Sequence, residues 1–291
     1  MDVSIIFVNY KTKDLTIDAI KSVQEKTVGL EYEIFVVDNN SQDGSIEAIE
    51  QEFPNINIIK NERNAGFGTA NNLGIRQAKG KYVFCLNTDT LLINNAIKIM
   101  FDFMEKEENK NVGVCGGYLC DKNMKAMSCG GMLPTINEIY WKFALRYIFR
   151  ERYKKYKLTI NSDDKNYADK IEYIIGADIF FRKSVLDEVG LFDENIFLYY
   201  EETDLCKRIK NKGYDIKFVK DAQIIHLEGG SGNNKYIAKE RSKTSEFYYF
   251  KKYYPEKVLL LKVLYACLYF IDGYILQNSD SKKLLKYVIK L

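Results

Sequence analysis

Residues 81–90 read KYVFCLNTDT, an apolar run followed at once by a polar turn that ends in an acid. The run 82–86 has the length and the β-branched and aromatic content of a strand that is covered on both faces of a parallel sheet. Asn87, Thr88 and Asp89 then fall at the carboxyl end of that strand, where open α/β sheets bind ligands. Asp89 is therefore a candidate metal ligand, and the alternative is an ordinary turn in which the aspartate caps a helix.

Strands and helices alternate on both sides of this stretch. We expect strands at 3–8, 33–37, 57–60, 112–117, 172–182 and 222–226, and helices at 13–26, 46–53, 94–107, 183–189 and 205–212, with one more ending at 78. This alternation predicts an α/β fold, a doubly wound, Rossmann-like, mostly parallel sheet flanked by helices.

Composition narrows the class of protein. The 291 residues are 46% hydrophobic, enough for one catalytic domain with appendages. Lys and Arg number 43 against 40 Asp and Glu, a bias too small to indicate nucleic acid as a partner. The six cysteines form no Cys-x-x-Cys pair, and the N-terminus lacks the pattern of a signal peptide, so we expect a reduced, cytoplasmic setting.

Three carboxylates, Glu201, Glu202 and Asp204, stand within four positions after an apolar run. At the start of a helix they would face its positive end, which favours the ionised form and would keep a general base deprotonated near neutral pH. The alternative is simple acidic capping of that helix.

His226 is the only histidine in the chain, and the loop EGGSG follows at 228–232. Such a loop can close over a phosphate, and imidazole, carboxylate and phosphate oxygens form an acceptable shell for Mn²⁺, or for Mg²⁺ with more water. The alternative is a histidine satisfied in the core or on the surface.

Two segments combine apolar or aromatic residues with lysines, 140–157 and 258–276. Basic segments of this kind lie on anionic membrane surfaces or grip charged ligands. The second is interrupted by Lys262, Asp272 and Gly273, so we expect it to lie on a bilayer rather than span it. For 140–157 the alternative is a solvated helix whose aromatic residues fill a groove of the core. For 258–276 it is a C-terminal helix pair packed on the catalytic domain or at a homodimer interface.

Seven motifs within residues 3–231 occur in the order of one enzyme family. They are VVDNNS at 36–41, NAGFGTAN at 64–71, LNTD at 86–89, GA at 176–177, GLFDE at 190–194, YEETDL at 200–205, and His226 before a glycine-serine loop. The chain resembles the bacterial family 2 glycosyltransferases of the GT-A fold, most closely the rhamnosyltransferases.

The resemblance implies a nucleotide-sugar site. Tyr10 matches the aromatic residue that stacks on the base, and Asp38 matches the carboxylate that hydrogen-bonds it. The remaining donor-site residues are Asn9, Asn64, Gly66, Phe67, Asn71, Asn87 and Thr88. The donor implied is a dTDP- or UDP-sugar, with rhamnose favoured by the resemblance alone, and the acceptor is a glycan or a lipid-linked glycan of the cell envelope.

The resemblance also assigns the chemistry. Asp89 matches the last residue of the family's D-x-D metal motif, and Asn87 departs from Asp at the first position, so His226 would complete the shell. Glu202 falls where the family has the Asp of a Glu-Asp pair that acts as the base, with Glu201 and Asp204 in support. The mechanism implied is one in-line displacement with inversion.

The domains expected are a catalytic domain at 1–235 and a helical C-terminal extension at 236–291. The first divides into a nucleotide-binding half, 1–117, and an acceptor and catalytic half, 118–235. We expect the protein to be cytoplasmic, or peripheral at the inner face of the membrane.

Three other classes compete with this interpretation. A nicotinamide dehydrogenase would need glycine where Asn71 stands, with its glycines after the first strand. A sugar nucleotidyltransferase would need a glycine- and lysine-rich triphosphate loop near the N-terminus. A carbohydrate-binding module would not need Asp89, Glu202 and His226 together.

Overall fold

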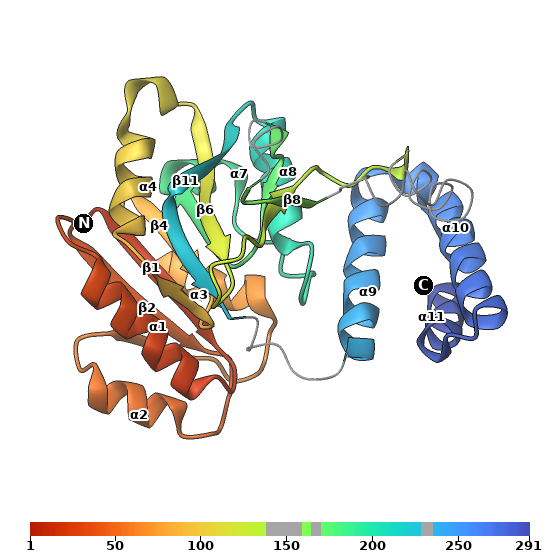
Figure 1. The fold of residues 1–291 in the computed structure, drawn as a ribbon, viewed down its shortest axis with the longest axis horizontal. Helices are drawn as coiled ribbons and strands as arrows, with labels where there is room; N and C mark the ends of the chain where they lie inside the picture. Colours follow the sequence, from red (N-terminus) through yellow and green to blue (C-terminus); the bar gives the residue numbers. More distant parts are fainter. Residues whose placement is uncertain (138–158, 164–169, 228–234) are drawn as a thin grey trace. The chain divides into compact units, whose positions relative to one another are not determined.

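The structure is a computed structural model, and it describes residues 1–137, 159–163, 170–227 and 235–291 (Figure 1). The described residues form two compact units. The first takes 1–132, 159–163, 170–197 and 201–227, and the second takes 133–137, 198–200 and 235–291. The basic segment 140–157 and the loop 228–232 lie outside the described residues.

The first half of the larger unit alternates strands and helices as predicted, with bounds within two residues. Its elements are β1 (Val3–Asn9), α1 (Lys13–Lys26), β2 (Tyr32–Asp38), α2 (Ser45–Glu52), β3 (Asn57–Lys60), α3 (Phe67–Gln77) and β4 (Tyr82–Leu86). The four strands pair in parallel in the order β3-β2-β1-β4. A mostly parallel, doubly wound sheet is confirmed here.

The second half continues the same sheet. Its elements are β5 (Thr90–Leu92), α4 (Ala96–Glu105), the short η1 (Glu107–Asn109), β6 (Val112–Cys120), β10 (Asp178–Arg182), α7 (Lys183–Val189), α8 (Glu201–Asn211) and β11 (Asp215–His226). The full order is β3-β2-β1-β4-β10-β6-β11-β5. The sequence missed β5, and it placed the starts of α8 and β11 too late.

The single strand predicted at 172–182 is wrong. The chain forms β9 (Tyr173–Ile174) in a small sheet with β7 (Ser128–Gly131) and β8 (Thr159–Asn161), and then crosses to β10 in the main sheet. Backbone hydrogen bonds mark the crossing, because the Ile175 N–H donates to Cys129 O and the Asn87 N–H donates to Ala177 O. Local composition cannot distinguish one strand from two that serve different sheets.

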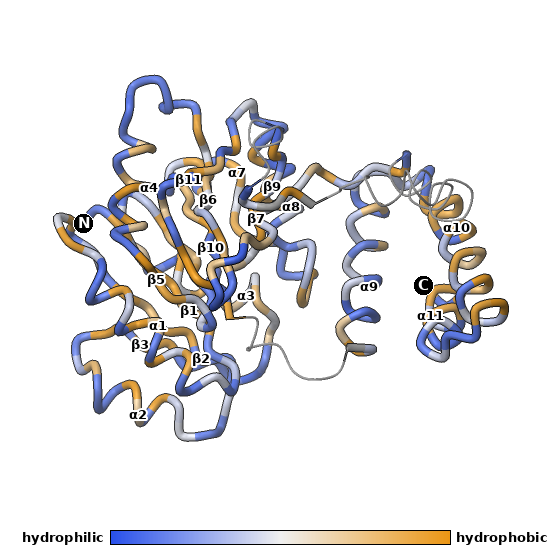
Figure 2. The backbone as a smooth tube through the Cα atoms, in the orientation of Figure 1, coloured by the Kyte–Doolittle hydropathy of each residue, from blue (hydrophilic) through white to orange (hydrophobic). Residues whose placement is uncertain are grey.

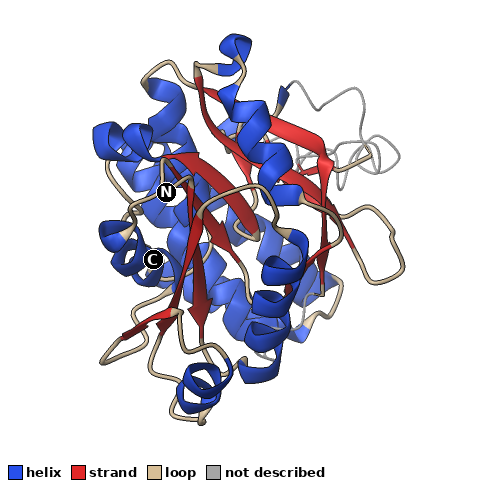
Figure 3. Cartoon of the chain, turned by 90° about the vertical axis from the view of Figure 1, so that its left-hand side faces the viewer, coloured by secondary structure: helices blue, strands red, loops and turns tan. Residues whose placement is uncertain are grey.

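The sheet is buried on both faces (Figure 3). One core joins Phe84 and Phe180 to apolar residues of α1 and α4, among them Ile20 and Met100. The other core lies against α3, α7 and α8. This explains why the central strands are unbroken apolar runs.

Strand direction fixes where the polar strand ends gather. β10 runs antiparallel to both β4 and β6, and β11 runs parallel to β6, so β1, β2, β4, β6 and β11 all point the same way. Asn9, Asp38 and His226 end three of these strands, and Asn87 follows a fourth. They therefore share one edge of the sheet, which is where open α/β sheets bind ligands.

The smaller unit confirms the predicted helical extension. It contains α9 (Lys235–Tyr253), the turn η3 (Pro255–Lys257), α10 (Val258–Phe270), the π-helical turn η4 (Ile271–Ile275) and α11 (Ser279–Lys290). Its own core includes Tyr249, Phe250, Leu261 and Val288.

The expectation that segment 258–276 is too interrupted to span a bilayer needs correction. Among the described residues, the helical stretch Pro255–Ile275 is long and apolar enough to cross a membrane by length and composition. Lys262 and Asp272 are its only charges after Lys257, which is too few to exclude it on that ground.

Candidate active site

A buried polar network closes the ends of β1 and β2. The Asn9 side-chain amide donates to Asp38 Oδ1 at 2.7 Å and to Ser41 Oγ at 3.0 Å. The hydroxyl of Thr16 donates to Asn9 Oδ1, and the Ser41 N–H donates to Asp38 Oδ2. Several hydrogen bonds thus hold Asn9, and Asn9 in turn orients Asp38, the carboxylate that the family resemblance assigns to the nucleotide base.

Tyr10 follows directly on this network with 42% of its surface exposed. Lys11, whose Nζ lies 5.6 Å from the ring centre, has a left-handed φ of 59°. A cavity of about 270 Å³ is lined by Asp38, Ser41 and Asn61 among others. Tyr10 is not among its lining residues, and the exposed ring is itself suited to stacking on a planar ligand.

The glycine loop before α3 is bound to β2 by Asn39, a residue that sequence reasoning left out of the site. Its Nδ2 donates to Asn64 Oδ1 at 2.9 Å and to Gly66 O at 3.2 Å, and its Oδ1 accepts from the Ala65 N–H. The signal was its place in the strand-end motif at 36–41. Asn64 thus belongs to a scaffold that shapes the loop.

Gly66 allows a close approach that no side chain would permit. Its φ is 92°, and a Cβ built there would lie 2.2 Å from Phe197 O. The next N–H, that of Phe67, donates to the same oxygen at 3.0 Å. The glycine therefore joins the start of α3 to the segment that precedes α8.

The remaining motifs meet at the start of α3. A Cβ on Gly68 would lie 2.9 Å from Phe192 Cβ and 3.4 Å from Glu201 Cβ, and one on Gly176 would lie 3.7 Å from Phe67. Four motifs far apart in the sequence thus pack together.

Asn71 is fully buried inside α3. Its Nδ2 donates to Phe67 O at 3.1 Å, while its Oδ1 has no hydrogen-bond partner among the described residues. Its contact with a donor stays a prediction.

Hydrogen bonds hold both Asn87 and Thr88, which lie in the turn after β4. The Asn87 carbonyl accepts from Thr90 Oγ1 at 2.6 Å, and the Thr88 hydroxyl donates to Thr12 Oγ1 at 3.1 Å. These contacts orient the turn that carries Asp89.

Asp89 and His226 come together because β5 and β11 pair antiparallel, with His226 opposite Thr90. His226 Nε2 lies 3.4 Å from Asp89 Oδ1, and the Leu227 N–H donates to Asp89 O at 2.8 Å. Neighbouring ligands of an octahedral ion with bonds of 2.0–2.1 Å lie roughly 3 Å apart. The pair fits two positions on a divalent cation, and the described residues offer no cluster of three ligand side chains.

Burial changes the acidity of Glu201 and Glu202, which begin α8. Burial, reinforced by the charge of Glu202, raises the pKa of Glu201 well above its usual range, and Glu201 Oε2 is buried without a partner among the described residues. Burial also raises the pKa of Glu202, which keeps some exposure, to about 7.

The expectation that the helix start favours the ionised form is therefore wrong in sign, because desolvation outweighs the helix terminus. A carboxyl group with a pKa near neutrality is suited to accept a proton at physiological pH.

Asp204 is fully buried and accepts from Arg208 Nε at 2.9 Å. The same guanidinium donates to the carbonyls of Val189, Gly190 and Leu191. Asp204 thus supports the helix start through Arg208. Its contact with an acceptor stays a prediction.

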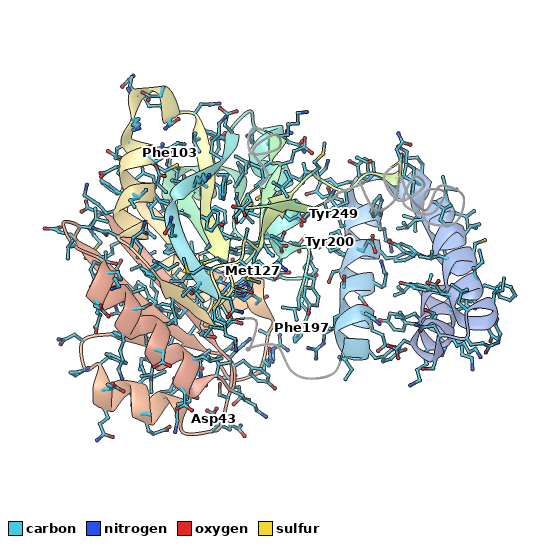
Figure 4. The ribbon with its side chains drawn as sticks, in the orientation of Figure 1. Asp43, Phe103, Met127, Phe197, Tyr200 and Tyr249 are labelled. Atoms are coloured by element: carbon cyan, nitrogen blue, oxygen red, sulfur yellow. The ribbon has the colours of Figure 1, made fainter. Side chains whose placement is uncertain are left out.

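Two consecutive aromatic residues before α8 have left-handed backbones. The φ angles of Tyr199 and Tyr200 are 67° and 72°. Bulky residues rarely adopt this region. The Tyr200 ring lies 5.6 Å from that of Tyr249 in α9 (Figure 4), so the smaller unit fixes this residue.

Asp178 is a buried acid that sequence reasoning missed. It lies opposite Leu86 in the sheet, and its Oδ2 accepts from the Gly117 N–H at 2.6 Å. Its Oδ1 has no partner in the part of the chain that is described. Burial raises its pKa well above the usual range, despite the Gly117 hydrogen bond. A lone aspartate in the run DIFF was the available signal.

Comparison with known proteins identifies the family. The profile described as Glycosyl transferase family 2 matches residues 4–190. The N-acetylglucosaminyl-diphospho-decaprenol L-rhamnosyltransferase of Mycobacterium tuberculosis is 23% identical over 214 residues, covering 68% of this chain and 67% of that protein. The poly-beta-1,6-N-acetyl-D-glucosamine synthase of Staphylococcus epidermidis is 26% identical over 221 residues, covering 74% and 47%.

Solved structures give the same fold. The mannosyltransferase PcManGT from Pyrobaculum calidifontis, in complex with GDP-Man and Mn²⁺, has a TM-score of 0.58 at 14% identity and covers 99% of this chain and 84% of that one. S. aureus TarS residues 1–349 in complex with UDP give 0.56 at 16% identity, covering 96% and 74%. The predicted GT-A fold is confirmed. Because the family profile matches more than half of the sequence, the chain belongs to glycosyl transferase family 2.

Proposed function

We propose that this glycosyltransferase moves a sugar from a nucleoside diphosphate to an acceptor hydroxyl with inversion at the anomeric carbon. The observation that carries the proposal is that one sheet edge collects Asp38, Asp89 and His226, while burial holds Glu202 near a neutral pKa. A single displacement needs a donor site, a means of balancing diphosphate charge, and one base.

Glu202 is the proposed base. It takes the proton of the acceptor hydroxyl as that oxygen bonds to the anomeric carbon, and the bond from that carbon to the diphosphate oxygen breaks. Burial raises the pKa of Glu201 well above its usual range, which disfavours a second negative charge beside Glu202. A smaller negative charge beside Glu202 helps it to ionise.

A divalent cation, Mn²⁺ or Mg²⁺, is proposed on Asp89 and His226, and it supplies positive charge to the departing diphosphate. The 3.4 Å separation of the two side chains supports this assignment. The Mn²⁺ reported with PcManGT supports a metal in this fold. Asn87 stands where the family has a second carboxylate, and it provides no charge. Asp89 and His226 would therefore be the two protein ligands, and the diphosphate and water would supply the others.

The proposed donor is a dTDP- or UDP-sugar, with rhamnose favoured. Support comes from the exposed ring of Tyr10 beside Asp38, whose carboxylate can accept from the imide N–H of a pyrimidine. The name of the mycobacterial relative supports rhamnose and a lipid-linked acceptor. We place the reaction in cell-envelope glycan synthesis at the inner face of the membrane.

A panel of nucleotide sugars, assayed for release of nucleoside diphosphate with and without a polyprenyl-diphosphate glycan, tests this function. We expect a pyrimidine donor to give the fastest release, with the acceptor raising the rate and the product having the inverted anomer by NMR. Faster release from a purine donor than from any pyrimidine donor refutes the assignment of Tyr10 and Asp38 to a pyrimidine base. Sugar binding without any release favours a carbohydrate-binding module.

A further inference from the structure

The helix α10 and the π-helical turn η4 after it have an exposed apolar stripe, formed by Leu259, Val263, Cys267 and Phe270 of α10 and Tyr274 of η4. The spacing of three or four residues places these side chains on one helical face. Leu259 is 73% exposed, and apolar colour dominates α10 in Figure 2. Exposed stripes of this length mark interaction sites.

The opposite face of α10 is firmly held within the smaller unit. Leu261, Tyr265 and Tyr269 are buried there. The Tyr265 hydroxyl donates to Glu246 Oε1 at 2.8 Å, and Lys243, which pairs with the same glutamate, lies with Nζ 3.8 Å from the Tyr265 ring centre. These contacts tie α10 to α9 and leave the stripe exposed.

The sequence on both sides of this helix is rich in lysine. From Lys251 to Leu291 the chain has eight lysines and three carboxylates. Of the carboxylates, Asp272 is buried and Asp280 pairs with Lys239 at 3.1 Å. The exposed lysines are Lys251, Lys252, Lys283, Lys286 and Lys290.

We propose that α10 lies flat on an anionic lipid surface, with the stripe at acyl depth and the lysines against the headgroups. This extends the proposed function, because it would hold the enzyme where a lipid-linked acceptor resides. An apolar face flanked by lysines suits such a surface. A second copy of the chain would bring a like-charged surface against the lysines. A bilayer-spanning α10 would have to abandon the Tyr265–Glu246 bond.

Flotation of the full-length protein with vesicles tests the proposal without any donor. We expect flotation with phosphatidylcholine containing roughly a third phosphatidylglycerol, weak flotation with phosphatidylcholine alone, and release by high salt. The variant L259Q/V263Q/F270Q should bind at least ~10-fold more weakly, since each side chain loses apolar burial. The matched control V28Q/M124Q changes two exposed apolar residues of the larger unit and should float like the wild type.

Four outcomes overturn the proposal, the last of them resistance to carbonate extraction. The first is no flotation of the wild type, and the second is equal flotation of the stripe variant. The third is a lipid-free dimer, seen by light scattering, that the stripe variant converts to a monomer. Carbonate-resistant wild-type protein would show a spanning helix instead. Loss of donor turnover without loss of flotation would overturn the proposed function and leave the lipid surface standing.

Discussion

The pH dependence of catalysis should report Glu202 directly. Burial raises the pKa of this carboxyl to about 7, and the base acts only when it is ionised. With that pKa, roughly a tenth of the enzyme is competent at pH 6 and roughly nine tenths at pH 8. We therefore expect kcat/KM for the donor to rise about tenfold between these values, with a slope near one below pH 6.

Two neighbouring variants sharpen this test. Glu202→Gln removes the base and should lower kcat by about 10²-fold or more at pH 8, with donor affinity retained and the acidic limb abolished. Glu201→Gln removes a carboxyl group whose ionisation burial already disfavours, so it should keep most of the activity. The assay is coupled release of nucleoside diphosphate from pH 5.5 to 8.5, with circular dichroism as the control for folding.

The reasoning fails if the wild-type profile is flat from pH 6 to 8. It also fails if Glu202→Gln keeps wild-type kcat while Glu201→Gln is inactive, which would move the role by one residue.

Four further substitutions test three other features. Asp89→Ala and His226→Ala should each weaken Mn²⁺ binding by ~10-fold or more, read by paramagnetic resonance without turnover, and unaltered binding in both excludes the metal assignment. Asp178→Asn should raise the free energy of unfolding in urea at pH 8 by ~1 kcal/mol or more. The native acid, with its raised pKa, loses stability as pH rises above the unfolded pKa near 4, so the gain should shrink at pH 4.5, and a constant gain contradicts the reasoning. Gly66→Ala should cost ~2 kcal/mol or more by thermal or urea unfolding, because its Cβ would meet Phe197 O, and a stable variant would show that the loop can shift.

The local sequence pattern was sufficient to predict element bounds where a predicted segment corresponds to a single helix or a single strand. The sequence predicted the bounds of α1, β3, β4 and α7 as observed, because apolar periodicity and a stop signal agree there. It failed at 172–182 because pairing partners, rather than composition, decide which sheet a strand joins. β5 was missed because three residues carry too little periodicity, and its strand character comes from pairing with β11.

The candidate active site likewise has features that the local sequence predicts and features that depend on tertiary packing. Strand-end polar residues such as Asp38 and Asp89 could be predicted, because their place in the sheet follows from their place in the chain. The pKa shifts of Glu201 and Glu202 could not, since they depend on how deeply packing buries them. Asn39 was missed because its role arises from loops that fold against it.

Tyr199 and Tyr200 both have a positive φ, so the usual effect of a glycine substitution on stability is reversed at these positions. At most positions glycine loosens the chain, but here it would relieve conformational strain of about 1–3 kcal/mol per residue. A glycine at either position should therefore stabilise the native turn, and at position 200 it would also remove the ring contact with Tyr249. The tyrosines thus favour a fixed geometry beside Glu202 at a cost in stability. Selection for heat resistance would favour glycine at these positions, and selection for turnover would favour tyrosine.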